Sequence, residues 1–267
     1  MSSAPESLTH LRIERPVDGV ALLTLDNPDQ MNAMSDEMTR SWAAAIADLK
    51  SDASVRCVVV TGAGRAFSAG GNTTWLAESG ALPTPALRDQ MLAFYRTWLA
   101  IRDLEVPTIA AVNGAAVGAG LGIALACDIR YAAAGAKLGA SFVKLGLHPG
   151  MGISYLLPEV VGDAAARDLL LTGRLVEADE ALRLGLVSRV IEREGFLDEV
   201  LAVATQVAAN APLATRYAKV TLRRQRTSLD ETLQVEALAQ PITFGTEDLQ
   251  EGIAAVQARR SPSFTGK

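Results

Sequence analysis

Two apolar runs in this chain each end in a turn built from very small residues. The first run covers residues 57–60 and is followed by glycine and alanine positions between 62 and 71. The second covers residues 107–112 and is followed by small residues between 114 and 120. Each run predicts a buried strand that ends just before a helix. Turns of this kind leave backbone N–H groups free to face a ligand oxygen, and two of them can form an oxyanion hole. This pattern favours chemistry at a carbonyl group.

The rest of the first part of the chain predicts further alternation of strands and helices. Apolar-rich segments at 11–14 and 20–25 predict two strands, with a turn at residues 18–19 between them. Another strand is predicted at 128–131, after the second small-residue turn. Successive strand–helix units are typical of stacked layers with right-handed crossovers.

Local signals predict where several helices begin. Ser35 is expected to cap a helix whose buried face falls, at helical spacing, on Met38, Trp42, Ile46 and Leu49. Thr84 is expected to cap another helix, with Pro85 at its first position.

From about residue 195 onward the pattern is helical only. Pro212 begins one predicted helix, Ser228 and Glu231 form a capping-box pattern for the next, and Thr246 begins a third. No linker rich in Pro, Ser or Gly separates the two parts. We therefore predict one core, residues 1–194, with a C-terminal helical region, residues 195–267.

Composition narrows the class of protein. Aromatic residues make up 5% of the chain, which is typical of layered α/β proteins rather than all-β sandwiches. The formal net charge is −5 and the basic residues are dispersed, so we expect no nucleic-acid partner. The polar N-terminus lacks the pattern of a signal peptide. We expect a soluble, cytoplasmic protein.

Cysteine and histidine usage excludes two further kinds of site. Cys57 and Cys127 both lie in apolar runs and are expected to be buried thiols. With only His10 and His148 beside them, neither a disulfide framework nor a metal site is expected. Residues 106–127 carry no charge, but a proline and several glycines interrupt them. A buried strand, turn and helix explain this segment better than a membrane span does, so we expect no membrane partner.

The order and spacing of several motifs resemble those of the crotonase superfamily, also called the enoyl-CoA hydratase/isomerase family. These motifs lie at residues 27–33, 64–72, 107–120, 126–130, 171–173 and 181–187. The resemblance implies an α/β fold, a spiral of ββα units with a C-terminal helical trimerisation region. It also implies a homotrimer or a dimer of trimers. The ligand implied is an acyl-CoA thioester of acyl-CoA or fatty-acid metabolism, with coenzyme A as part of the substrate and no separate cofactor.

The resemblance also assigns residues to the site. The N–H groups of Ala69 and Ala119 would bind the thioester carbonyl oxygen. Residues beside the coenzyme A thioester would be Gln30, Met31, Ala33, Ala69, Gly71 and Asn72. Gln30 stands where the family often carries Lys or Arg. Asn72 stands where many members carry Asp, and either residue can cap a following helix.

The acids that the family uses for proton transfer are missing from the corresponding positions. The two hydratase glutamates fall on Gly122 and Phe142, and the carboxylate of isomerases and an aryl-CoA dehalogenase branch falls on Gly150. Hydration by paired glutamates is therefore not expected. Glutamates introduced at positions 122 and 142 are expected to give some hydratase activity.

Other side chains could take over the chemistry. His148 is the catalytic candidate, because histidine titrates near neutral pH. Glu78, Ser141 and Tyr155 are alternatives, each also explained by packing or by a solvated surface.

Three functions remain open from the sequence. The first is an enzyme of the family, an acyl-CoA lyase or isomerase, with an unassigned reaction. The second is a non-catalytic acyl-CoA-binding protein. The third is a hydrolase or a carbon–carbon bond-cleaving member that uses His148.

Overall fold

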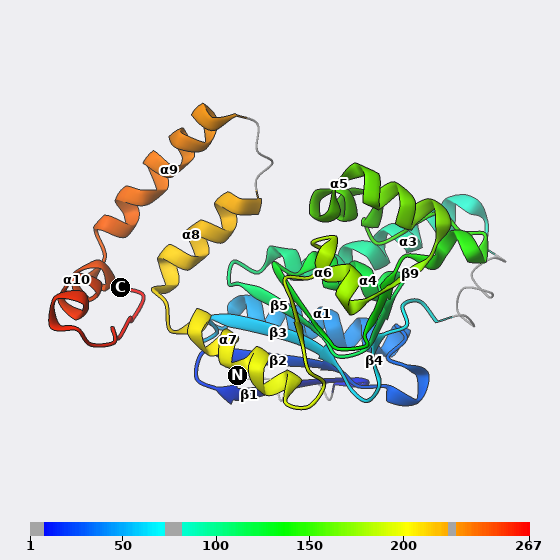
Figure 1. Ribbon diagram of the computed structural model, residues 1–267, viewed down its shortest axis with the longest axis horizontal. Helices are drawn as coiled ribbons and strands as arrows, with labels where there is room; N and C mark the ends of the chain where they lie inside the picture. Colours follow the sequence, from blue (N-terminus) through cyan, green and yellow to red (C-terminus); the bar gives the residue numbers. More distant parts are fainter. Residues whose placement is uncertain (1–7, 73–81, 224–227) are drawn as a thin grey trace.

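Two β-sheets with helices packed around them form the body of the protein (Figure 1), a computed structural model that describes residues 8–72, 82–223 and 228–267. The larger sheet has the strand order β1-β2-β3-β5-β7-β10. β1 pairs antiparallel with β2, and all other neighbours in this sheet are parallel. Its strands are Leu11–Val17 (β1), Val20–Leu25 (β2), Cys57–Gly62 (β3), Thr108–Val112 (β5), Ile129–Ala133 (β7) and Arg189–Ile191 (β10).

The smaller sheet has the order β4-β6-β8-β9. β4 and β6 continue the chain just beyond β3 and β5 and pair in parallel with each other, so the two small-residue turns lie side by side. β8 is parallel to β6 and antiparallel to β9. The strands are Ala66–Ser68 (β4), Ala115–Val117 (β6), Lys137–Gly139 (β8) and Leu175–Glu177 (β9).

Helices cover both faces of the larger sheet, and none in the described part of the chain is long and apolar enough to cross a bilayer. The short 3-10 helices are Pro28–Gln30 (η1), Ala100–Asp103 (η2) and Ser141–Leu145 (η3). The α-helices are Asp36–Ser51 (α1), Thr84–Leu99 (α3), Ala119–Ala126 (α4), Ile153–Thr172 (α5), Ala178–Arg183 (α6), Phe196–Ala208 (α7), Pro212–Arg223 (α8), Leu229–Phe244 (α9) and Glu247–Ala258 (α10).

The apolar runs of the central strands are continuous because both faces of the larger sheet are buried. In β3, Val58 and Val60 point into the main core, whereas Cys57 and Val59 point to the opposite face. On that opposite face the strands pack against α7. Burial raises the pKa of Cys57 and Cys127 to about 12, and the expectation of buried free thiols is confirmed.

The helix starts follow the local signals with one exception. Ser35, Ser228 and Thr246 each cap a helix by accepting a hydrogen bond from a first-turn N–H, as predicted. The prediction for Thr84 is wrong, because Thr84 is already the first residue of α3. The Pro83 carbonyl oxygen accepts the first helical bond, from Leu87 N, so the cap lies one residue earlier and uses no side chain.

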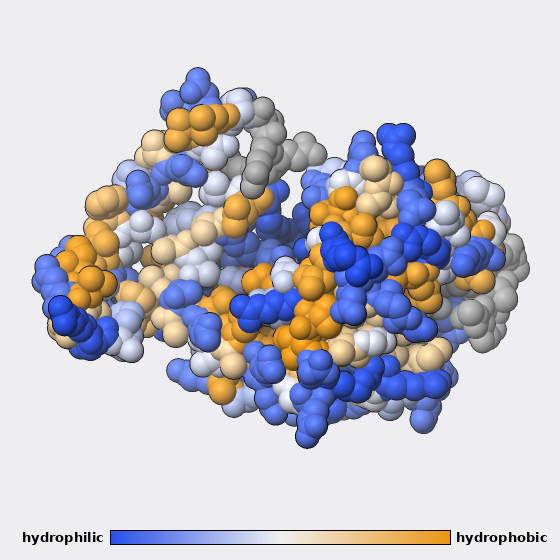
Figure 2. Space-filling model, in the orientation of Figure 1, coloured by the Kyte–Doolittle hydropathy of each residue, from blue (hydrophilic) through white to orange (hydrophobic). Residues whose placement is uncertain are grey.

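The last three helices form an arm that extends away from the two sheets, which we define as α8–α10 (Figure 1). Apolar side chains line much of its surface (Figure 2), among them Leu229, Leu238 and Val256, each more than 70% exposed. By contrast, α7 packs on the larger sheet. The division at residue 195 stays a prediction.

The C-terminal segment folds back onto the arm through two carboxylates. Glu251 accepts hydrogen bonds from Arg260 at 2.6 and 2.7 Å and from Ser263 N at 2.8 Å. Asp248 accepts bonds from the backbone N–H groups of residues 265 and 266. The Arg260 hydrogen bond, together with that from Ser263, lowers the pKa of Glu251 from 4.5 to about 2.

We expect the Glu251 contact to open under acid. A carboxylate whose pKa is lowered by folding stabilises the fold above its ordinary pKa and loses that contribution as the pH falls. Protection of the Ser263 amide from hydrogen exchange should therefore decline between about pH 4.5 and pH 2. Glu251→Gln should remove this pH dependence. Unchanged protection of Ser263 at pH 2 would contradict the prediction.

Candidate functional site

The end of β4 lies directly against the start of α4. Gly70 shows how close the approach is: a Cβ atom there would lie 2.6 Å from the Val117 carbonyl oxygen and 2.9 Å from the Ala119 nitrogen. Gly70 also has a φ of +89°, which side chains other than glycine rarely adopt. A Cβ at Gly120 would collide with the Ser68 backbone. The two turns predicted from the sequence therefore meet, and only small residues permit the contact.

The two predicted oxyanion donors differ in their present partners. Ala119 is the first residue of α4, so its N–H has no acceptor within the helix. The Ala69 N–H donates to the Met31 carbonyl oxygen at 2.9 Å. A ligand oxygen that uses both N–H groups must compete with Met31 for Ala69.

The segment around η1 brings the predicted binding residues beside this turn. Met34 N donates to the Gly70 carbonyl oxygen at 2.8 Å, next to an isolated bridge between Met34 and Gly71. Asn72 Nδ2 donates to Gln30 Oε1 at 3.3 Å. Gln30, Met31, Ala33, Ala69, Gly71 and Asn72 thus belong to one cluster. The helix that Asn72 was expected to cap, and Glu78, lie outside the described residues.

Two asparagines that the sequence analysis missed hold the loops of this cluster. Asn32 is fully buried and donates from Nδ2 to the carbonyl oxygens of Ala63 and Ala66, while its Oδ1 accepts from Asn27 N. Asn113 accepts a bond from Gly62 N at 3.1 Å. Asparagine side chains that hydrogen-bond backbone groups in this way rigidify a loop. In the sequence, the only signal that could have identified Asn32 is its place in the motif at residues 27–33.

Side chains already fill the space at two of the three missing acid positions. A Cβ at Gly122 would lie 2.6 Å from Met151 Cβ, and a Cβ at Gly150 would lie 2.6 Å from Tyr95 Oη. At the third position, the Phe142 side chain is half-buried and packs against the main core.

The other candidates from the sequence lie on more open surface. His148 is exposed, and its Nδ1 lies 2.7 Å from the Pro149 carbonyl oxygen. Tyr155, on α5, is 50% exposed. Ser141 begins η3 and is half-buried. The catalytic role of His148 stays a prediction.

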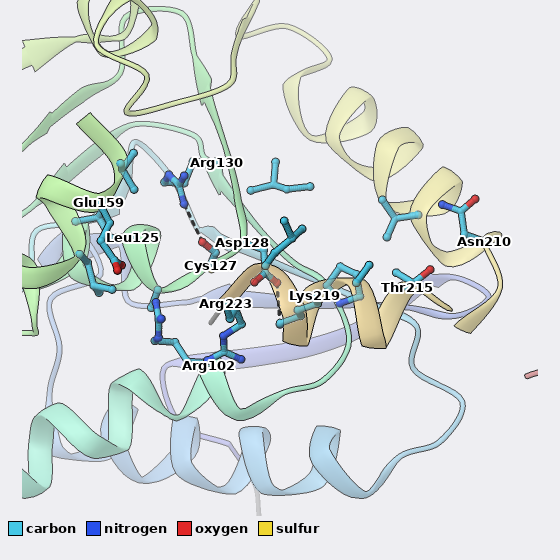
Figure 3. Close-up of a pocket in the computed structure, with 18 residues that line it drawn as sticks. Arg102, Leu125, Cys127, Asp128, Arg130, Glu159, Asn210, Thr215, Lys219 and Arg223 are labelled. Carbon is cyan, nitrogen blue, oxygen red and sulfur yellow. Dashed lines mark hydrogen bonds and ion pairs between the residues drawn. The ribbon is translucent and has the colours of Figure 1, made fainter. Parts of the chain in front are cut away.

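A cavity of about 950 Å³ lies elsewhere, between the body of the protein and α8 (Figure 3). Its described lining contains none of the residues assigned to the thioester. The charged side chains that line it are Arg102 from η2, Asp128 from the loop after α4, Arg130 from β7, Glu159 from α5, and Lys219 and Arg223 from α8. Burial, together with the nearby Arg102, lowers the pKa of Arg223.

A buried ion pair joins α8 to the body of the protein at this cavity. Lys219 Nζ lies 2.7 Å from Asp128 Oδ2 and donates to the Val106 carbonyl oxygen at 2.7 Å. Asp128 also accepts hydrogen bonds from the N–H and hydroxyl of Thr108, both at 2.8 Å. The Lys219 side chain is only 4% exposed.

We expect Asp128→Asn to lower the free energy of unfolding by about 3 kcal/mol, because it leaves a buried ammonium group without its counter-charge. Denaturant unfolding measures the change. Asp89→Asn, which breaks the exposed pair with Arg88, is the matched control and should have no measurable effect. Adding Lys219→Met to Asp128→Asn should recover part of the loss. Equal stability of Asp128→Asn and the wild type would contradict this role of the pair.

Comparison with known proteins places this fold in a class. A crystal structure of an enoyl-CoA hydratase from Bacillus anthracis superposes with a TM-score of 0.91 at 31% identity, over 97% of this chain and 100% of that one. The crotonyl-CoA hydratase of Syntrophomonas wolfei is 34% identical over 250 residues, which cover 93% of this chain and 95% of the relative. A Thermus thermophilus protein whose name places it with the enoyl-CoA hydratases is 41% identical over 246 residues, 92% of this chain and 97% of that protein.

The sequence profile of the enoyl-CoA hydratase/isomerase family matches residues 15–267. The chain belongs to this family, and the resemblance to the crotonase superfamily is confirmed. Its α/β fold is the crotonase fold.

Proposed function

We propose that the chain is an enzyme that binds an acyl-CoA thioester and holds its carbonyl oxygen with the N–H groups of Ala69 and Ala119. The observation that carries the proposal is the approach of Gly70 to the Ala119 nitrogen, which brings the two turns together. Fixed donors of this kind stabilise the negative charge that enolates and tetrahedral adducts place on a thioester oxygen. The Ala69 donor becomes available when the thioester oxygen replaces the Met31 carbonyl.

The reaction that we propose is not hydration by paired glutamates. None of the three aligned positions carries an acid, and Met151 occupies the space at position 122. Met151, which lies against position 122, and Phe142 are both apolar. We assign the chain to acyl-CoA or fatty-acid metabolism at the level of the family, with coenzyme A bound as part of the substrate.

Calorimetric titration with crotonyl-CoA and a long-chain acyl-CoA tests this function, with absorbance recorded on the same mixtures. Binding with loss of the enoyl thioester signal would point to a catalytic group outside the three positions, and His148→Ala would then be compared with the wild type. Binding without change would favour another reaction or a carrier. Absence of binding by either thioester would refute the proposal.

We further propose that the arm packs on a second copy of the chain, giving the homotrimer or dimer of trimers that the family resemblance implies. Support comes from its exposed apolar residues, including Leu238 at 75% and Phe244 at 63%. Apolar patches of this kind favour burial against a partner. Sedimentation equilibrium of the full chain would give the mass directly, and a monomer at micromolar concentration would contradict this proposal.

A further inference from the structure

Tyr95 reaches the candidate site from a distant part of the chain. It lies on α3, and its Oη would be 2.6 Å from a Cβ atom at Gly150. Its neighbour in the site, Met151, is 1% exposed and lies against Gly122, one turn into α4 after Ala119. The phenol thus approaches the loop that packs against α4, the helix whose first residue is Ala119.

The surroundings of Tyr95 keep its hydroxyl neutral and available. The side chain is half-buried, packs against the main core and meets Phe94 at a ring-centroid distance of 6.2 Å. Burial raises its pKa above 10. No hydrogen-bond partner for Oη lies among residues 8–72, 82–223 and 228–267. A half-buried hydroxyl that makes no hydrogen bond to the protein is free to bond a ligand or a water molecule.

A neutral phenol can give a proton at physiological pH but cannot take one. A reaction that starts by removing an α-proton needs a base, and the aligned positions 122, 142 and 150 supply none. Loss of CO2 from the α-carbon produces the same enolate without a base. Apolar neighbours such as the buried Met151 and the half-buried Phe142 also favour conversion of a carboxylate into neutral CO2, because they solvate the charged group poorly.

We propose that Tyr95 is the proton donor of this site and that the substrate is a 2-carboxyacyl thioester, the malonyl type, which the enzyme decarboxylates. The inference rests on the proposed function, since it needs the thioester oxygen at Ala69 and Ala119. It adds to that function a substrate class and a catalytic residue.

The bond between the α-carbon and the carboxylate breaks, CO2 leaves, and the electron pair passes into the enolate whose oxygen the Ala69 and Ala119 N–H groups hold. The α-carbon then takes the proton from Tyr95 Oη, forming a C–H bond. The Tyr95 phenolate regains a proton from water. The products are the shortened acyl thioester and CO2.

Malonyl-CoA in deuterated water tests the proposal. The wild type should release CO2 and form acetyl-CoA that carries one deuteron from the solvent, detected by mass spectrometry. Tyr95→Phe removes only the hydroxyl and should slow the formation of acetyl-CoA over many turnovers by about 10²-fold or more, because protonation of the enolate follows the loss of CO2. Its affinity for acetyl-CoA, measured by calorimetry, should stay within about twofold of the wild type, as for a group that acts in the transition state only. Tyr217→Phe, at a half-buried tyrosine on α8, is the control and should behave as the wild type.

The pH profile separates a proton donor from a packing residue. Wild-type turnover should fall at high pH as the phenol ionises, and residual turnover of Tyr95→Phe should lack this limb. A Tyr95→Phe variant that turns over at the wild-type rate would overturn the inference. So would a Glu78→Gln variant that loses turnover while Tyr95→Phe keeps it. Binding of acetyl-CoA without CO2 release by the wild type would overturn decarboxylation and leave the proposed function standing. Failure to bind any acyl-CoA would refute the proposed function itself.

Discussion

The Ala119→Pro variant should fold like the wild type and yet consume its thioester substrate about 10²–10³-fold more slowly, the usual cost of losing one oxyanion donor. Proline replaces the backbone N–H by the ring Cδ, so the donor is lost. The position is suited to the change, because Ala119 is the first residue of α4 and proline is favoured at that place in a helix.

The residue before the proline also tolerates the substitution. A proline restricts its predecessor to extended conformations. Gly118 has φ 55° and ψ −122°, the mirror image of an extended conformation, which glycine adopts readily. Thermal unfolding should therefore change little, and this measurement accompanies the kinetics.

Ala119→Gly provides the matched control. It alters the same side chain but keeps the N–H, so turnover should stay close to that of the wild type. If Ala119→Pro is stable and as active as Ala119→Gly, the thioester oxygen does not use this donor and the assignment of Ala119 is wrong.

The parts of the fold that the sequence predicts well depend on local or strictly repeated features. β3 is recognisable because Val58, Val59 and Val60 are all buried, some against the main core and some against α7. A buried parallel strand therefore needs no alternation. Ser35 and Ser228 act within three residues of their own positions. Such local signals do not depend on how the rest of the chain packs.

Features that depend on packing or on peptide orientation are not visible in the sequence. The Pro83 and Thr84 positions both fit a helix start, and only the path of the backbone decides between them. The Met31 carbonyl accepts a hydrogen bond from Ala69 in a loop where residue 31 has a left-handed φ of 50°. Methionine rarely adopts this conformation, so the sequence does not predict it.

The candidate site shows the same limit. Ala69 and Ala119 could be assigned because each lies in a motif of its own. Tyr95 and Gly150 are 55 positions apart, and they meet only because α3 packs beside the loop that precedes α5. No spacing rule connects two such residues, so only the structure shows that Tyr95 lies beside Gly150.

The contact between Gly122 and Met151 changes what is needed to build a hydratase on this scaffold. Gly122→Glu with Phe142→Glu restores the two family acids, but any side chain at position 122 would overlap Met151 Cβ. Overpacking of this kind costs about 1–3 kcal/mol and displaces the new side chain. Met151→Gly removes the Cβ, and its left-handed φ of 56° suits glycine.

We therefore expect the triple variant Gly122→Glu, Phe142→Glu, Met151→Gly to hydrate crotonyl-CoA at least about 10²-fold faster than the wild type, the lower end of what a positioned acid or base contributes. Loss of the enoyl absorbance measures the rate. Glutamine at positions 122 and 142, with Met151→Gly, matches the size without the proton transfer and should remain inactive. A folded triple variant that binds crotonyl-CoA and does not hydrate it would contradict the prediction. Because such a variant carries both glutamates and holds the thioester, the result would show that positions 122 and 142 do not face the double bond.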